Sequence, residues 1–306
     1  MAKGIIWWGI NNIFGVETNG LQTECRLKGK VLKDAEQEYN PLAPGDLVEW
    51  EASDSGRGLI SARLPRKNAY QRWNKKRRQP QTIAANLDLL LLVTTTQSPP
   101  FRPRFLDRAL VMAEKENLPV KIVVNKIDLG LDGEIEDRLA GYQDLGCEVA
   151  LCSSLTSEGI EDLQVSLYGK TAALVGQSGV GKSSLLNRLV PGAHQRVGEL
   201  SAKYDRGNHT TNFALLYAWD GRTGGIIDTP GVREFEVFGI APASLSAHFP
   251  DFEPFQGKCT FNRCTHRVEP GCAIRAAVEN GLIEPDRWDT YLKIYEDLLV
   301  AEKTWM

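Results

Sequence analysis

A glycine-rich segment in the middle of the chain constrains the fold more than any other feature. Residues 176–183 have the spacing Gly-x-x-x-x-Gly-Lys-Ser, with an apolar run at 172–175 before them and a helix-favouring run after them. A strand, a glycine loop and a helix in this order are typical of the phosphate-binding loop of nucleoside triphosphatases. The glycines let the backbone turn sharply, so that backbone N–H groups and the helix N-terminus face the phosphates. The sequence therefore predicts an α/β domain that binds a nucleotide.

Two side chains of this loop have a defined chemical role. Lys182 would contact the β- and γ-phosphates and assist their hydrolysis, and the hydroxyl of Ser183 would bind Mg²⁺. The surrounding backbone would bind the remaining phosphate oxygens. The expected phosphate contacts are Gly176, Gln177, Ser178, Gly179, Val180, Gly181, Lys182, Ser183 and Ser184.

A four-residue motif after an expected strand at 120–124 predicts which base is bound. The Asp128 carboxylate can accept hydrogen bonds from guanine N1–H and N2–H₂, which adenine does not offer. The aliphatic stem of Lys126 can cover the ring. Ser153 and Ser154 follow the next expected strand, where a backbone N–H can bind the guanine oxygen. GTP and GDP are the expected nucleotides, and the motif is Asn125, Lys126, Ile127 and Asp128.

A second acidic motif would complete the phosphate site. A further expected strand ends in Asp228, and Gly231 follows it. Asp228 would hold Mg²⁺ through water, and the Gly231 N–H would contact the γ-phosphate during catalysis. The polar segment 195–212 offers Thr210 or Thr211 as another Mg²⁺ ligand, and the alternative is that both threonines simply begin a strand.

The residue that orients the attacking water is harder to assign. Small GTPases place a glutamine directly after Asp-x-x-Gly, but this chain has Val232 there. Intrinsic hydrolysis should therefore be slow. His209 is the internal candidate for a catalytic role, because an imidazole can position or deprotonate water. The alternatives are a residue of a partner, or a loop histidine that contacts only RNA or solvent.

The order of the motifs differs from that of an ordinary GTPase. The base-reading motif precedes the phosphate loop, whereas it usually follows Asp-x-x-Gly. A parallel sheet tolerates this change because it can be rejoined where its termini lie close. We therefore predict a circularly permuted GTPase domain at 81–238, with helices on both faces of a parallel sheet. The segment after Gly231 would lead into the C-terminal domain, so that the nucleotide state would pull on that domain.

The first 80 residues predict a small β-rich domain. Short strand-like runs at 5–8, 21–27, 46–52 and 58–64 are separated by turn signals. Several short strands at this spacing favour a barrel of the oligonucleotide-binding (OB) type, which is one of several small barrels with this periodicity.

A basic stretch follows this barrel. It holds no acid, and Tyr70 and Trp73 are interleaved with its cations. Basic side chains neutralise phosphates and aromatic rings stack on unpaired bases, so the stretch resembles an RNA-contacting loop. A solvated linker is the alternative. The cations are Arg63, Arg66, Lys67, Arg72, Lys75, Lys76, Arg77 and Arg78.

Residues 239–306 predict a small helical domain that holds a metal. Its cysteines and histidine have the spacing Cys-x₄-Cys-x-His-x₅-Cys. Three thiolates and one imidazole form a closed tetrahedral set, as in structural zinc sites, and the zinc would stabilise a small core. Disulfides or a chance cluster are the alternatives. The predicted zinc ligands are Cys259, Cys264, His266 and Cys272.

Together these motifs resemble the ribosome small subunit-dependent GTPase A family (RsgA/YjeQ) over nearly the whole chain. The permuted order and the cysteine–histidine spacing are specific features of the resemblance. It implies an OB domain at 1–80, a permuted GTPase domain at 81–238 and a zinc domain at 239–306. It further implies a late role in assembly of the small ribosomal subunit, with slow hydrolysis of GTP that the subunit stimulates. Partners would be the subunit, its rRNA and other assembly factors.

Bulk properties agree with this interpretation. The 306-residue chain has a net charge of −3, so contact with nucleic acid must come from a local patch. It has no signal-peptide pattern and no apolar stretch near the ~20 residues of a membrane span. We expect a cytoplasmic monomer without membrane contact, whose six cysteines serve metal binding or packing.

Three functions are weighed on these residues. The first is a GTP-hydrolysing checkpoint on the small ribosomal subunit. The second is a non-catalytic RNA-binding module that uses nucleotide only to fix its shape, which Val232 leaves open. The third is an ATP-dependent metabolic enzyme, against which Asn125 and Asp128 argue.

Overall fold

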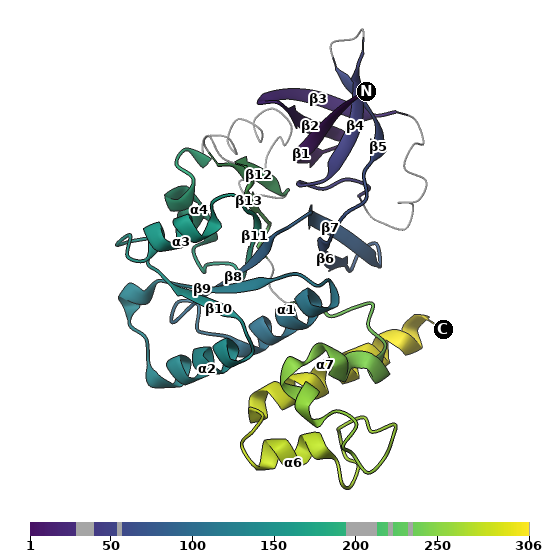
Figure 1. Ribbon diagram of the computed structural model, residues 1–306, viewed down its shortest axis with the longest axis vertical. Coiled ribbons are helices and arrows are strands. Elements are labelled where there is room, and N and C mark those ends of the chain that lie inside the picture. The colour runs from purple at the N-terminus through teal and green to yellow at the C-terminus, as the bar shows by residue number, and fades with distance from the viewer. Residues whose placement is uncertain (29–39, 54–56, 194–212, 220–222, 232–234, 306) are drawn as a thin grey trace.

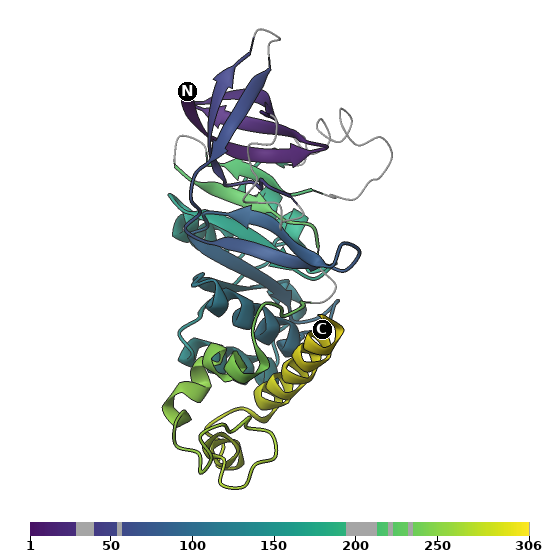
Figure 2. The same cartoon turned by 90° about the vertical axis from the view of Figure 1, so that its right-hand side faces the viewer.

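The computed structural model describes residues 1–28, 40–53, 57–193, 213–219, 223–231 and 235–305. The N-terminal barrel and the C-terminal helices lie at opposite ends of an elongated molecule, with an α/β layer between them (Figure 1). The same order along the long axis is seen after a quarter turn (Figure 2). The arrangement confirms the three-part fold class expected from the sequence.

The five described N-terminal strands close into a barrel. They pair in the order β1-β2-β3-β5-β4, and β4 pairs back with β1. Their inward side chains, such as Ile6, Val48 and Ile60, are fully buried in a core of their own. The strands are β1 (Ala2–Ile10), β2 (Ile13–Thr18), β3 (Leu21–Leu27), β4 (Leu47–Ala52) and β5 (Gly58–Arg63).

The sequence indicated that the basic stretch is a loop. In the structure most of it forms a β-hairpin. Strand β6 (Ala69–Asn74) pairs antiparallel with β7 (Gln79–Ala85) as a separate two-stranded sheet. Its first residues are buried, and its turn is exposed. The hairpin connects the barrel to the α/β sheet.

The α/β sheet has the order β10-β9-β8-β11-β13-β12, and β11, which leads into the phosphate loop, lies in its interior. All its neighbouring strands run parallel except β12, which is antiparallel to β13. Its strands are β8 (Leu89–Thr95), β9 (Val120–Asn125), β10 (Glu148–Leu151), β11 (Thr171–Gly176), β12 (Leu215–Ala218) and β13 (Gly225–Asp228).

Helices cover both faces of this sheet, as predicted. Successive residues of β8 alternate between two apolar cores: Leu90 packs with α1 and α2, whereas Leu91 packs with α3 and α4. A strand buried on both faces needs a continuous apolar sequence, which explains the run of leucines in β8. The helices are α1 (Pro103–Lys115), α2 (Gly133–Asp144), α3 (Ile160–Leu167) and α4 (Lys182–Leu189).

Barrel and sheet are joined by backbone pairing. Trp8 of β1 pairs antiparallel with Leu215 of β12, so both sheets form one continuous ladder. The buried Trp8 ring packs in the core beneath α3 and α4. A Cβ at Gly15 would lie 2.1 Å from Nε1 of Trp8, so only glycine fits beside the ring in β2.

The C-terminal part consists of short 3₁₀ turns, a loop and two helices. It packs on α1 through Phe249, Phe252 and Tyr291, whose rings contact one another. No helix among the described residues has the length and apolarity to cross a bilayer. The elements are η3 (Pro242–His248), η4 (Pro250–Phe255), α6 (Ala273–Glu279) and α7 (Pro285–Trp305).

Candidate nucleotide site and metal centre

The predicted phosphate loop connects β11 to α4. Gly179 and Gly181 have φ values of 86° and 89°, a region that favours glycine. Nζ of Lys182 donates hydrogen bonds to the carbonyl oxygens of Gly176 at 2.8 Å and Gln177 at 3.0 Å. The loop therefore curls around the ammonium group, which is poised to exchange these carbonyls for phosphate oxygens.

Asp228 and Gly231 lie beside this loop. Asp228 ends β13 and is in register with Leu174 of β11. A Cβ at Gly231 would lie 3.2 Å from Nζ of Lys182, so the backbone of Gly231 approaches the phosphate loop closely. The structure thus places Asp228 and Gly231 beside the phosphate loop, and their Mg²⁺ and γ-phosphate roles stay predictions.

Burial changes the charge balance of this pair. It raises the pKa of Asp228 to about 6, although the neighbouring Lys182 opposes the shift. Burial also lowers the pKa of Lys182, against the influence of Asp228. Both groups are thus incompletely solvated and would gain from a bound Mg²⁺ and phosphate respectively.

The base-reading motif touches the phosphate loop. Nδ2 of Asn125 donates to the carbonyl of Val180 at 2.9 Å, and Nζ of Lys126 donates to that of Gly179 at 2.8 Å. A Cβ at Gly181 would lie 2.4 Å from Nδ2 of Asn125, so this glycine permits the approach. Two segments that are far apart in sequence form one continuous site.

Ser153 and Ser154 contact the base-reading motif. Oγ of Ser153 donates to Oδ1 of Asp128 at 2.5 Å, which orients the carboxylate. The N–H of Ser154 donates to Oδ1 of Asn125 at 2.9 Å. A guanine oxygen that accepted from this N–H would have to share it with Oδ1 of Asn125 or replace Oδ1 as the acceptor.

Sequence reasoning missed a contact from the loop after β8. Nζ of Lys126 also donates to the carbonyl of Ser98 at 2.5 Å, and the Pro99 ring lies near Gly179. The available signal was the Ser-Pro-Pro turn directly after a buried strand end, because such edges carry ligand sites.

The remaining catalytic candidates lie outside the described residues. These are the proposed water-positioning His209 and the alternative Mg²⁺ ligands Thr210 and Thr211. Their roles stay predictions. Val232, which stands where a glutamine is expected, also lies outside the described residues.

Part of the basic stretch has a structural role. Arg66 pairs with the fully buried Asp46 at 2.7 Å, and Lys75 pairs with Glu236 at 2.6 Å. These cations are therefore already partnered within the chain. Three exposed cations at the turn of the β6–β7 hairpin are Lys76, Arg77 and Arg78.

The four predicted zinc ligands converge. One ligand atom from each residue lies within 4.8 Å of all the others. Nδ1 of His266 is 3.6 Å from Sγ of Cys259 and 3.5 Å from Sγ of Cys272. Tetrahedral zinc with Zn–S of about 2.3 Å and Zn–N of about 2.0 Å places sulfur and nitrogen about 3.5 Å apart. The donor set therefore fits zinc, which would cross-link the loop.

The cluster is supported from its surroundings. The backbone N–H of Ala273 donates to Sγ of Cys259 at 3.4 Å, as expected beside a thiolate. Nε1 of Trp288 in α7 donates to the carbonyl of His266 at 3.0 Å. Burial alone would raise the pKa of the Glu269 carboxyl. Hydrogen bonds from Thr265 and from backbone N–H groups outweigh it and lower this pKa to about 2. This carboxylate holds the ligand loop in shape.

Comparison with known families supports the interpretation of the chain as a GTPase with the motifs described above. The family model described as RsgA GTPase matches residues 63–238. The small ribosomal subunit biogenesis GTPase RsgA of Borreliella burgdorferi strain ZS7 is 40% identical over 293 residues, covering 95% of this chain and 94% of the relative. Its counterpart in Chlorobaculum tepidum is also 40% identical, over 92% of this chain and 94% of the relative.

Two solved structures resemble this chain over nearly its whole length. YjeQ from Thermotoga maritima has a TM-score of 0.74 and 33% identity, covering 97% of this chain and 98% of that one. YloQ, described as a circularly permuted GTPase, has a TM-score of 0.71 and 27% identity, covering 98% and 96%.

Proposed function

Because this chain belongs to the RsgA GTPase family and is a GTP hydrolase, we propose that it acts as a late checkpoint in biogenesis of the small ribosomal subunit. The GTP-bound form would dock on the subunit. Hydrolysis, slow in the free protein and stimulated by the subunit, would then release it.

One observation carries the proposal of GTP as the substrate. The base-reading motif is hydrogen-bonded to the phosphate loop through Asn125 and Lys126. A purine held by Asp128 would therefore place its phosphates at Lys182. Guanine is favoured because the carboxylate accepts from N1–H and N2–H₂.

The phosphate side of the site has a clear division of roles. Lys182 would stabilise charge that develops on the β- and γ-phosphates, and the Gly231 N–H would contact the γ-phosphate. Ser183 and Asp228 would hold Mg²⁺, which neutralises the phosphate charge when bound. We assign Thr210 or Thr211 as its further ligand and His209 as the group that positions water; a residue of the subunit is the alternative to His209.

The β6–β7 hairpin supports the assignment of rRNA as the direct partner. Its turn exposes Lys76, Arg77 and Arg78, and positive charge of this kind neutralises phosphates. The exposed cations Lys258 and Arg263 beside the zinc cluster would add a second contact. Residues 1–80 and 239–306 would thus bind the subunit on either side of the GTPase domain at 81–238.

Further partners follow from the same role. A checkpoint on the subunit would encounter other assembly factors there, in the cytoplasm. We propose a monomer as the acting form.

Turnover measurements test the hydrolase role. The full chain should hydrolyse GTP rather than ATP, and purified small subunits should raise the rate. Lys182→Ala should abolish turnover, because the group that contacts the β- and γ-phosphates is lost. Equal use of ATP would contradict the base assignment, whereas bound subunits that leave GTP turnover unchanged would favour the non-catalytic RNA-binding alternative.

Co-sedimentation tests the checkpoint. The chain should sediment with small subunits in a non-hydrolysable GTP analogue and dissociate in GDP. Neutralising Lys76, Arg77 and Arg78 to alanine should lower the salt slope of binding by roughly 2 to 3. Lys293→Ala, which removes an exposed α7 cation paired with Asp289, is the matched control. A salt-independent affinity would contradict contact with rRNA through the hairpin.

A further inference from the structure

The last turn of α4 contacts the base-reading side of the pocket. Nε of Arg188 donates to the carbonyl of Ser154 at 2.9 Å, and its Nη2 lies 3.3 Å from the carbonyl of Leu155. Helix α4 begins with Lys182 at the phosphates. The same helix therefore reaches both ends of the proposed nucleotide site.

Arg188 and Asn125 fix Ser154 from opposite sides. Asn125 accepts from the N–H of Ser154, which belongs to the peptide before its Cα. Arg188 binds the carbonyl of Ser154, which belongs to the peptide after its Cα. With both peptide planes held, little rotation is left about the two backbone bonds of Ser154.

We propose that Arg188 is a positioning residue for guanine recognition, because it holds the Ser154 peptide so that its N–H, shared with Oδ1 of Asn125, meets the O6 atom of the base. This inference rests on the proposed binding of GTP and GDP. Arg188 does not touch the nucleotide; it acts through the backbone of Ser154. The guanidinium suits this task because its planar fork donates to neighbouring carbonyls at once.

The inference predicts an effect confined to one atom of the base. Arg188→Ala should weaken GDP binding by roughly threefold to tenfold, because two hydrogen bonds from a charged donor are lost, each at an exposed site. The loss should appear as faster dissociation. Contacts to the N2 amino group come from Asp128, so they should be unaffected.

Three nucleoside diphosphates separate positioning from general damage. GDP and inosine diphosphate both carry O6, and inosine lacks only the N2 amino group. The diphosphate of 2-aminopurine riboside keeps that amino group but lacks O6 and, with it, the proton on N1. Arg188→Ala should weaken the first two by the same factor and leave the third unchanged.

A neighbouring residue provides the matched control. Nε2 of Gln164 in α3 donates to the carbonyl of Leu189, so Gln164→Ala removes a tie to the same end of α4 without touching Ser154. It should leave all three affinities unchanged. Arg188→Lys should restore part of the GDP affinity, because an ammonium can still bind one carbonyl.

The outcomes are distinct. Equal weakening of all three ligands, or unchanged GDP binding in Arg188→Ala, would overturn the role of Arg188. If the unmodified chain itself bound the 2-aminopurine ligand as well as GDP, the proposed reading of O6 would fail instead.

Discussion

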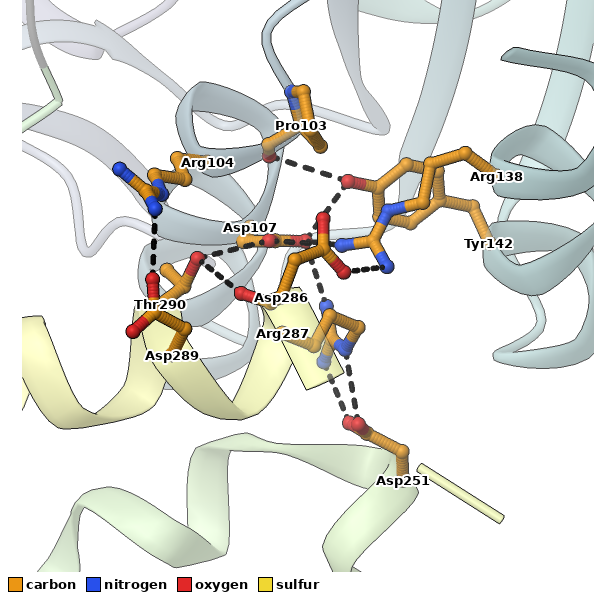
Figure 3. A network of polar contacts seen from close by, with 10 residues as sticks. All are labelled: Pro103, Arg104, Asp107, Arg138, Tyr142, Asp251, Asp286, Arg287, Asp289 and Thr290. Carbon is orange, nitrogen blue, oxygen red and sulfur yellow. Dashed lines mark hydrogen bonds and ion pairs between the residues drawn. The ribbon is translucent and has the colours of Figure 1, made fainter. Parts of the chain in front are cut away.

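The carboxylate of Asp107 in α1 accepts a hydrogen bond from Nη1 of Arg287 in α7 at 3.0 Å, inside the contact between the GTPase sheet and the C-terminal helix (Figure 3). Nη2 of Arg138 in α2 donates to the same carboxylate at 3.0 Å. Arg287 also binds Asp251 at 2.6 Å and 2.9 Å. One buried network thus connects both parts of the chain.

This network bears on how nucleotide state reaches the C-terminal part. The sequence suggests that the segment after Gly231 transmits a conformational change from the nucleotide site to the C-terminal part. Further along the chain, the ring of Phe235 contacts Tyr70 of β6 and Phe105 of α1. Beyond that point the buried ion pairs fix the C-terminal helix to α1. A change after Gly231 that moved α7 relative to α1 would have to break these pairs.

Asp107→Asn should destabilise the protein strongly. The substitution leaves the buried guanidinium groups of Arg138 and Arg287 without the charge of their common partner, and breaking a buried pair in this way costs about 3–5 kcal/mol. Denaturant unfolding with bound GDP measures the loss.

Asp289→Asn is the control for this experiment. Asp289 binds Arg104 at 2.7 Å and Lys293 at 2.9 Å, but all three side chains are substantially exposed. Removing an exposed pair should cost less than about 1 kcal/mol. If both variants lost the same free energy of unfolding, burial of the Asp107 network would not add to its stabilising effect.

Asp128→Asn should change base preference from guanosine to xanthosine diphosphate. The asparagine amide would donate to the O2 atom of xanthine, where the carboxylate accepted from the guanine amino group. Ser153 can still donate to the side-chain oxygen, which keeps the loop in place. Competition binding with the two diphosphates provides the measurement, and an unchanged preference for guanosine would contradict the base-reading role.

Mg²⁺ affinity of the GDP complex should fall as the pH drops through about 6. Burial raises the pKa of Asp228 to this value, so that below it the carboxyl is protonated and offers no negative charge to the cation. Well below the pKa, apparent affinity should fall about tenfold per pH unit. Above the pKa it should be constant.

Asp228→Asn separates this effect from titration of the nucleotide. The variant should bind Mg²⁺ weakly at all pH values and show only the slope that the phosphates contribute. Identical pH profiles for variant and unmodified chain would contradict the role of Asp228.

The nucleotide and zinc residues could be predicted because each set lies in a short motif with its own chemistry. The phosphate loop requires a positive φ at Gly181 and a positive charge at Lys182, a combination that few other loops require. The strand β2 was missed because Gly15 interrupts its pattern, and that glycine is explained only by the Trp8 ring across the sheet. Local sequence cannot show such a contact.

Long-range polar contacts were invisible for the same reason. Asp107 and Arg287 are 180 residues apart, and neither stands in a motif. The basic hairpin was taken for a loop because its cations mask the pairing of β6 with β7, and the acid that binds Lys75 comes from a distant segment. Charge in a sequence reports a partner only when that partner is near in the chain.

Cys264→Ser should remove zinc without emptying the nucleotide site. Burial and the neighbouring thiols raise the pKa of Cys264 to about 12, so this thiol ionises readily only beside a cation. Replacing it leaves an incomplete tetrahedral set, and metal content should fall from about one ion per chain to almost none. Hydrogen exchange should rise across residues 258–272, because the zinc would cross-link this loop.

GDP affinity should stay unchanged in this variant, because α7 remains fixed to α1 through Asp107 and Arg287. Cys147→Ser is the control: it alters a half-buried thiol outside the cluster and should retain zinc. Zinc retained by Cys264→Ser would exclude Cys264 as a required ligand. Loss of GDP binding together with zinc would instead show that the zinc loop, and not the buried network alone, holds the C-terminal part against the GTPase domain.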